Sequence, residues 1–195
     1  LVKLNDGFSG DGNAIIRYPD LPYKQSLESW MRQNLHTAII PVANGMSAAQ
    51  FLEKFQQMGG IVEAFVEGEN KCSPSVQCRI NPMGAVDVIS THDQQLTGEF
   101  AQVFAGAHFP ANAEYRNEIA RLGMQVALEL RDRGVTGRFS FDFVSVKEDT
   151  NWKHYAIEIN LRKGGTTHPF LMMQFLTNGN YNAVTGLFET ANKQS

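Results

Sequence analysis

The stretch RFSFDFVSVKEDTNWKHYAIEINLR, residues 138–162, alternates apolar and polar side chains on both sides of a short charged segment. Side chains of a β-strand point alternately to its two faces, so the pattern predicts strands over residues 138–146 and 152–161 that pair as a hairpin. Each strand then has an apolar face for the core. These apolar positions are Phe139, Phe141 and Phe143 in the first strand and Tyr155, Ile157 and Ile159 in the second.

The polar faces of this hairpin bring two acids together. With the centre of the turn at Thr150, Asp142 lies directly opposite Glu158, and their Cβ atoms are ~5 Å apart. Two carboxylates at that separation repel each other unless a cation or a shared proton lies between them. Asn160 adds a third oxygen, and oxygen ligands favour Mg²⁺ or Mn²⁺ over zinc. An exposed polar face on an edge hairpin is the alternative, because a one-residue shift would reverse the faces.

A glycine-rich turn near the N-terminus supplies complementary chemistry. Residues 1–4 and 13–17 predict two strands, and NDGFSGDGN joins them. Glycines let backbone N–H groups surround an anion, and Lys3 in the first strand can bind phosphate as a point charge. The turn has neither the Walker nor the Rossmann spacing, and a plain flexible hairpin is the alternative. Together with the acids, however, it indicates a site for Mg²⁺ and ATP.

The remaining elements mix helices and strands without a strict βαβ alternation, which favours an α+β fold. The other strands are expected at residues 61–66, 75–80 and 85–90. Helices are expected at residues 26–35, 48–58, 113–133, 170–176 and 181–193, the second of them capped by Ser47 with Gln50 in a capping box and ended by Gly59 and Gly60.

Composition narrows the functional classes. The chain has 195 residues, enough for one medium domain or two small lobes, and a net charge of -3. That charge argues against a nucleic-acid or anionic-membrane surface, and no apolar run approaches the ~20 residues of a membrane span. Cys72 and Cys78 are typical of a reduced cytoplasmic chain, although they could pair. Because the sequence starts without Met in LVKLNDG, we expect an N-terminal part of a larger protein to precede it.

These motifs resemble the ATP-grasp superfamily, whose members bind ATP between two α+β lobes with mainly antiparallel sheets. VKLNDGFSGDGN is similar to the lysine strand and mobile glycine-rich loop of that superfamily, and GGIVEAFVEG to the linker that carries the adenine. FDFV followed by YAIEINLR is similar to its Asp…Glu-x-Asn metal signature. The resemblance implies a small lobe over residues 1–62 and a large lobe over residues 63–195, without the N-terminal domain of the superfamily.

The resemblance also assigns roles to residues. It implies that Arg162 and Lys3 act in catalysis and that Mg²⁺ or Mn²⁺ binds Asp142, Glu158 and Asn160. The ATP-binding residues that it implies are Lys3, Ser9, Gly10, Gly12, Glu63, Phe65, Val66 and Glu69, with Glu67 as a second candidate for the ribose. Those expected to face the substrates are Gly165, Thr166, Thr167 and His168. His92, Asp93 and Gln94 form a second polar group that is expected beside the site or in a plain turn.

Within the superfamily, SPSVQCRINPMG, THDQQ, FAGAHFPA and EINLRKGGTTHPF resemble the pheganomycin-type peptide ligases. These implied relatives are cytoplasmic carboxylate–amine ligases that join an acid to an amino acid or peptide amine through an acyl-phosphate, and a homodimer is possible. Some peptide-forming members have an arginine two residues before the metal-binding Asp. Here that residue is Ser140, with Arg138 two residues further back, so Arg162 is expected to act alone on the developing charge. A catalytically inactive nucleotide-binding module with a regulatory or assembly role is the alternative.

Overall fold

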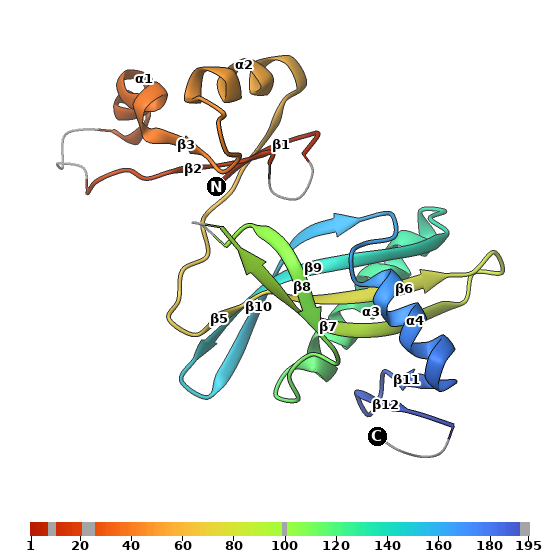
Figure 1. Cartoon of the computed structure of the whole chain (residues 1–195). Coiled ribbons are helices and arrows are strands. Elements are labelled where there is room, and N and C mark those ends of the chain that lie inside the picture. The colour runs from red at the N-terminus through yellow and green to blue at the C-terminus, as the bar shows by residue number, and fades with distance from the viewer. Residues whose placement is uncertain (8–10, 21–25, 99–100, 192–195) are drawn as a thin grey trace. The chain divides into compact units, whose positions relative to one another are not determined.

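The structure is a computed structural model that describes residues 1–7, 11–20, 26–98 and 101–191. The chain forms two compact units (Figure 1). Unit 1 consists of Leu1–Val66 with Leu96–Phe104, and unit 2 of Glu67–Gln95 with Ala105–Ser195. The expectation of two lobes divided at residue 62 stays a prediction. In the described part of the chain, no helix is long and apolar enough to cross a membrane.

Unit 1 contains a four-stranded antiparallel sheet in the order β3-β2-β1-β4 and two helices. The strands are β1 (Val2–Leu4), β2 (Asn13–Ile16), β3 (Ile39–Pro41) and β4 (Gly60–Val62), and the helices are α1 (Leu27–Ala38) and α2 (Ala48–Met58). Phe51 of α2 is fully buried against apolar residues of β1, β2 and β3. The capping box of Ser47 and Gln50 is confirmed, and Gly59 ends α2 with a φ of 74°.

Unit 2 is built on a larger antiparallel sheet in the order β10-β9-β6-β7-β8, with β5 also paired to β9. Its strands are β5 (Lys71–Cys72), β6 (Pro74–Ile80), β7 (Val86–Thr97), β8 (Val103–His108), β9 (Gly137–Glu148) and β10 (Asn151–Asn160). The helix α3 (Arg116–Asp132) packs on one face of this sheet. There Phe139, Phe141 and Phe143 form the core that the alternation of β9 predicts.

The approach of α3 to the sheet depends on a glycine. A Cβ atom at Gly123 would lie only 2.7 Å from Cγ1 of Val76 on β6. The helix backbone therefore reaches the sheet more closely than any other residue type would allow. A hydrophobic periodicity does not reveal this position, because glycine has no side chain to contribute to it.

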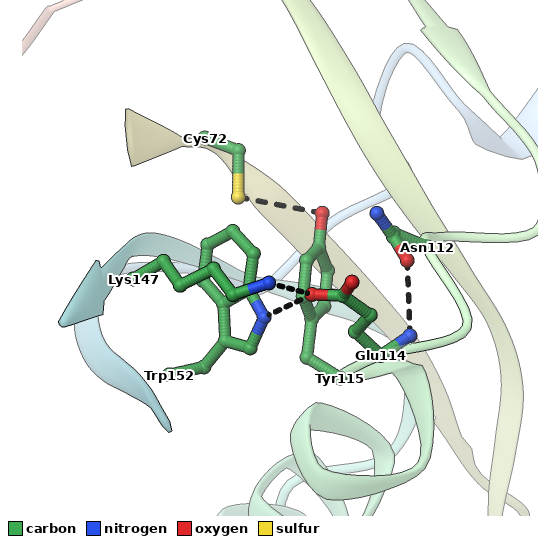
Figure 2. A network of polar contacts seen from close by, with 6 residues as sticks. All are labelled: Cys72, Asn112, Glu114, Tyr115, Lys147 and Trp152. Carbon is green, nitrogen blue, oxygen red and sulfur yellow. Dashed lines mark hydrogen bonds and ion pairs between the residues drawn. The ribbon is translucent and has the colours of Figure 1, made fainter. Parts of the chain in front are cut away.

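A polar network fastens the start of α3 to the turn end of the β9–β10 hairpin. Figure 2 shows that Glu114 accepts hydrogen bonds from Lys147, at 2.7 Å, and from the Trp152 indole, at 2.8 Å. Beside it the Cys72 thiol donates to the Tyr115 hydroxyl at 3.3 Å. Cys72 and Cys78 do not pair with each other in the structure. These contacts hold the hairpin at one end, while its other end carries the acids.

The predicted elements differ from the observed ones in two regions of unit 2. The predicted strand 85–90 is the first half of the longer β7, and β8 was not predicted. Residues 181–193 were expected to be helical, but they contain most of a small hairpin of β11 (Asn180–Asn182) and β12 (Leu187–Glu189). Its turn is made by the Asn182 side chain, which accepts from the backbone N–H groups of Val184 and Thr185. Such an Asx turn competes with a helix at its own position. The preceding helix is confirmed as α4 (Thr167–Thr177).

Candidate functional site

The two acids of the sequence motif face each other across β9 and β10. Glu158 is the register partner of Asp142, as predicted, and Asn160 is the partner of Ser140. The turn itself is one residue away from the prediction, because Asn151 pairs with Glu148 rather than with Asp149. A β-bulge between Ala156 and Glu158 then shifts the register by one residue and restores the predicted pair.

The same bulge makes the predicted apolar face of β10 wrong. Register partners point to the same side of a sheet, so Tyr155, opposite Val144, lies on the face that carries Asp142. Ile159 lies opposite Phe141 on the α3 face, but 49% of its surface remains exposed. The extra residue of a bulge exchanges the two faces of the strand beyond it. A prediction that assumes strict alternation along the whole strand cannot detect this exchange.

Four strands contribute to one polar face of the unit 2 sheet, opposite to α3. The ladder places two cross-strand rows next to each other. The first row is His92, Ser75, Asp142 and Glu158, and the second is Ser90, Gln77, Ser140 and Asn160, from β7, β6, β9 and β10 in turn. We call these eight residues the polar face. Its β7 and β6 members are buried, whereas Glu158 is exposed and Asp142 is partly buried.

The charged form of Asp142 is disfavoured at its position on this face. Burial, and secondarily the nearby Glu158 carboxylate, raise the pKa of Asp142 to about 6 against the opposing hydrogen bond of Ser75, the Arg162 charge and the Asn160 bond. The Asn160 amide nitrogen donates to Oδ2 of Asp142 at 3.0 Å. Among the described residues no group of three His, Cys, Asp or Glu side chains could hold a metal. The oxygen set here is two acids and one amide.

The predicted substrate-contacting turn is anchored through Gln77. The Gln77 amide donates to the Thr166 hydroxyl and accepts from the Thr167 hydroxyl at 3.1 Å. Thr167 also accepts from the backbone N–H of Gly164 at 3.1 Å. Thr166 and Thr167 are buried, at 7% and 2% exposure, and begin α4, whereas Gly165 and His168 are exposed. Their contact with a substrate stays a prediction, but the two threonine hydroxyls already bind Gln77.

Sequence reasoning did not select Gln77 or Ser75. The signal was present, because PSVQCRI alternates Ser75, Gln77 and Arg79 with apolar residues. His92 was named only as part of a polar group, and the structure separates it from Asp93. His92 is buried on the polar face, where it bonds Ser90 Oγ at 2.8 Å and burial lowers its pKa to about 4. Asp93 instead accepts from the Tyr115 hydroxyl at 2.6 Å.

The predicted nucleotide residues of unit 1 include an ion pair. The Lys3 ammonium lies 2.5 Å from Oε1 of Glu63, and both side chains are largely shielded from solvent. Gly12 and Gly7 are close enough that a Cβ atom on Gly12 would lie 2.7 Å from the Gly7 Cα atom. The glycines are therefore needed to bring the two arms of the turn together. Ser9 and Gly10 lie outside the described residues.

The remaining adenine and ribose candidates follow β4. This strand ends at Val62, so Glu63, Phe65 and Val66 are not in the strand that the sequence predicted over residues 61–66. Phe65 is 37% exposed, and Glu69 is exposed in unit 2. Binding of ATP by these residues stays a prediction.

Comparison with known families identifies the class of protein to which this chain belongs. Residues 22–184 match the family described as "IQCH-like, ATP-grasp". This match covers most of the chain, so the chain is an ATP-grasp protein with the α+β fold that the sequence predicted. More narrowly, it belongs to the IQCH-like family of ATP-grasp domains.

Two curated proteins resemble the chain over part of their length. The chain is 37% identical to L-propargylglycine--L-glutamate ligase of Streptantibioticus cattleyicolor over 123 residues, which are 63% of this chain and 24% of the ligase. It is 26% identical to IQ motif-containing protein H of Danio rerio over 143 residues, which are 72% of this chain and 13% of that protein. The chain thus spans a quarter or less of these relatives.

Solved structures give more distant likenesses. N5-carboxyaminoimidazole synthetase from Staphylococcus aureus complexed with ADP has a TM-score of 0.48 and 12% identity, covering 77% of this chain and 36% of that one. The biotin carboxylase domain of a single-chain bacterial carboxylase has a TM-score of 0.41 and 18% identity, covering 77% of this chain and 33% of that one. The family match, rather than these likenesses, carries the assignment.

Proposed function

We propose that this chain is part of an ATP-dependent carboxylate–amine ligase that forms an amide bond through an acyl-phosphate and releases ADP and phosphate. The observation that carries the proposal is the cross-strand pair of Asp142 and Glu158 with Asn160 beside it. Two findings support it: the chain belongs to the ATP-grasp superfamily, and part of it is similar in sequence to a ligase whose name contains two amino acids. The substrates would be a small carboxylic acid and an amino acid or peptide amine.

The polar face fits a divalent cation. Asp142 and Glu158 are facing carboxylates, and burial, with the Glu158 charge as a smaller cause, raises the pKa of Asp142 and so disfavours its charged form. All candidate donors are oxygens, which suits Mg²⁺ or Mn²⁺. When bound, such an ion would neutralise phosphate oxygens of ATP. Asn160, whose amide nitrogen faces Asp142 here, would contribute its oxygen.

The residues of the chain would act mainly by position and charge. Arg162, two residues beyond Asn160, is exposed and close enough to lower the pKa of Asp142, so its guanidinium can stabilise charge on a transferred phosphoryl group. Gln77 holds Thr166 and Thr167, and through them the turn after Arg162, against the sheet. The turn would thereby keep Gly165 and His168 in a fixed place for the substrate.

We also propose that Lys3 contacts ATP phosphates and that Glu63 contacts the adenine amino group. Because these two side chains now neutralise each other, nucleotide binding would have to replace their ion pair with contacts of at least equal strength. The glycine-rich turn, with Ser9, Gly10 and Gly12, would cover the phosphates. The residues from Phe65 to Glu69 would hold the adenine and ribose. A homodimer and a cytoplasmic location remain predictions from the sequence.

The test is ADP release by the purified protein with Mg²⁺, ATP and panels of acids and amino acids. Release should require all of them and should fall by at least about 100-fold in Glu158→Gln, which keeps the size of the side chain but loses its charge. Glu148→Gln is the matched control, because Glu148 is an exposed acid at the turn end of the same hairpin, paired with Lys153. Equal activity of the Glu158 variant would refute the role. ATP binding without ADP release under any combination would favour the inactive module.

A further inference from the structure

A third cross-strand row continues the polar face beyond Gln77, Ser140 and Asn160, and it is rich in arginine. Arg138 on β9 pairs in register with Arg79 on β6, and Arg79 pairs with Asp87 on β7. Arg138 is two residues before Ser140, so it lies on the same face of β9 as Ser140 and Asp142. Its guanidinium therefore belongs to the side of the sheet that carries the proposed site.

Of the two arginines in this row, one has an acidic partner and the other has none among the described residues. Arg79 forms an ion pair with Asp87, at 2.7 Å between Nη2 and Oδ2. Arg138 has no carboxylate partner among the described residues, and its Nη1 atom is buried without a hydrogen-bond partner there. Burial, and next the Arg79 charge, lower the pKa of Arg138. The cation is thus held where both its surroundings and its neighbour disfavour it.

Such a position needs an explanation, because an incompletely paired cation at a partly buried position costs free energy. Arginine does not lose its proton to escape that cost. An apolar side chain of similar length would fit the same strand position without the charge. The retained guanidinium is accounted for if an anion binds there during function, since planar N–H donors match a carboxylate in two parallel hydrogen bonds.

We propose that Arg138 binds the free carboxylate of the amino acid that supplies the amine. This inference rests on the proposed ligase function and adds the recognition of one substrate. Arg138 is four residues from Asp142 along β9, or ~13 Å between Cα atoms in an extended strand. It is therefore separate from the acids proposed to hold the cation. An amino acid held there by its carboxylate would present its amine towards the acids, and an amine without a carboxylate would not be held.

The test is a double-mutant cycle in which residue 138 of the protein and the carboxylate of the amino acid are changed separately and together. The amino acid that best stimulates ADP release is compared with its own α-carboxamide, which keeps the amine and loses the negative charge. With the unmodified protein, the carboxamide should have a KM about 30- to 100-fold higher, as expected for a charge-assisted pair. In Arg138→Met the free amino acid should show that same loss, and the carboxamide should show no further loss. Arg138→Lys should recover part of the affinity.

Arg79→Met is the matched control, because Arg79 is the cross-strand neighbour and already has Asp87 as its partner. Its KM for the amino acid should change less than about 3-fold. Thermal unfolding separates binding from a structural role: Arg138→Met should be at least as stable as the unmodified protein. Equal losses from the carboxamide in the protein with and without Arg138, or a destabilised Arg138→Met, would overturn the inference. If no amino acid stimulates ADP release at all, the ligase proposal fails instead.

Discussion

Replacing Asp142 with Asn should make the protein more stable at neutral pH while removing its response to Mg²⁺. The substitution keeps the shape of the side chain, and the new amide oxygen can still accept the hydrogen bond from Asn160. It removes a carboxylate that burial and Glu158 both disfavour. A stabilising substitution at a proposed ligand position is expected when a site is arranged for an ion rather than for the folded chain alone.

The magnitude follows from the pKa of Asp142, which rises from 3.8 to about 6 on folding. A raised folded-state pKa means that the favourable contribution is complete below pH 3.8 and is lost as the pH rises through 6. At 1.36 kcal/mol for each pKa unit, the loss amounts to roughly 3 kcal/mol by pH 7.5. Asp142→Asn does not undergo this loss.

Urea denaturation of both proteins at pH 4 and pH 7.5 measures the effect. The difference in unfolding free energy between Asp142→Asn and the unmodified protein should increase by roughly 2.4 kcal/mol from the lower to the higher pH, because a small part of the loss is already present at pH 4. Comparing the difference cancels the titrating groups that do not interact with residue 142. At pH 7.5, Mg²⁺ should stabilise the unmodified protein and leave the variant unchanged. A difference that is constant with pH, or a variant that Mg²⁺ stabilises equally, would refute this account of the site.

Three further substitutions test the surroundings of the site. His92→Gln should remove an acid-sensitive contribution of about 3 kcal/mol, because the lowered pKa of His92 makes stability fall as the pH drops from 6.5 to about 4; urea denaturation across that range measures it. Gln77→Leu should cost about 2–4 kcal/mol in urea denaturation by leaving the Thr166 and Thr167 hydroxyls without their partner, and a loss below 0.5 kcal/mol would contradict the anchoring role. Gly123→Ala should lower the midpoint of thermal unfolding. The added methyl group overpacks the contact with Val76 at a cost of about 1–3 kcal/mol, which exceeds the gain from the higher helix propensity of alanine; an unchanged or higher midpoint would contradict this packing role of Gly123.

The pairing of the two acids was predictable because both strands alternate strongly. Phe139, Phe141 and Phe143 leave the other face of β9 to Asp142, and the acids can then meet only in an antiparallel hairpin of nearly the predicted register. The same reasoning succeeded for the capped helix after Ser47, where a local motif fixes the start. Strong local patterns of this kind need no knowledge of distant neighbours.

The predictions that failed depend on what lies across the sheet. The bulge before Glu158 adds one residue to β10, and nothing in the alternation of that strand announces it. Gln77 belongs to the site only because α4 brings Thr166 and Thr167 to its amide, 89 and 90 residues later in the chain. A buried Gln within a strand is by itself an unexplained polar residue, and its partners come from tertiary structure.

The polar face contains groups that the fold alone does not account for. Buried positions in the central strands of a sheet favour apolar side chains. Strands β6 and β7 nevertheless carry the polar residues Gln77, Ser90 and His92 at such positions. Their mutual hydrogen bonds explain how the fold tolerates them. They do not explain the disfavoured Asp142 carboxylate or the Arg138 Nη1 atom, which has no hydrogen-bond partner among the described residues, and both residues lie on the same face of β9. One lies on each side of Ser140, and the cation proposed at the acids and the carboxylate proposed at Arg138 would each offset one of them.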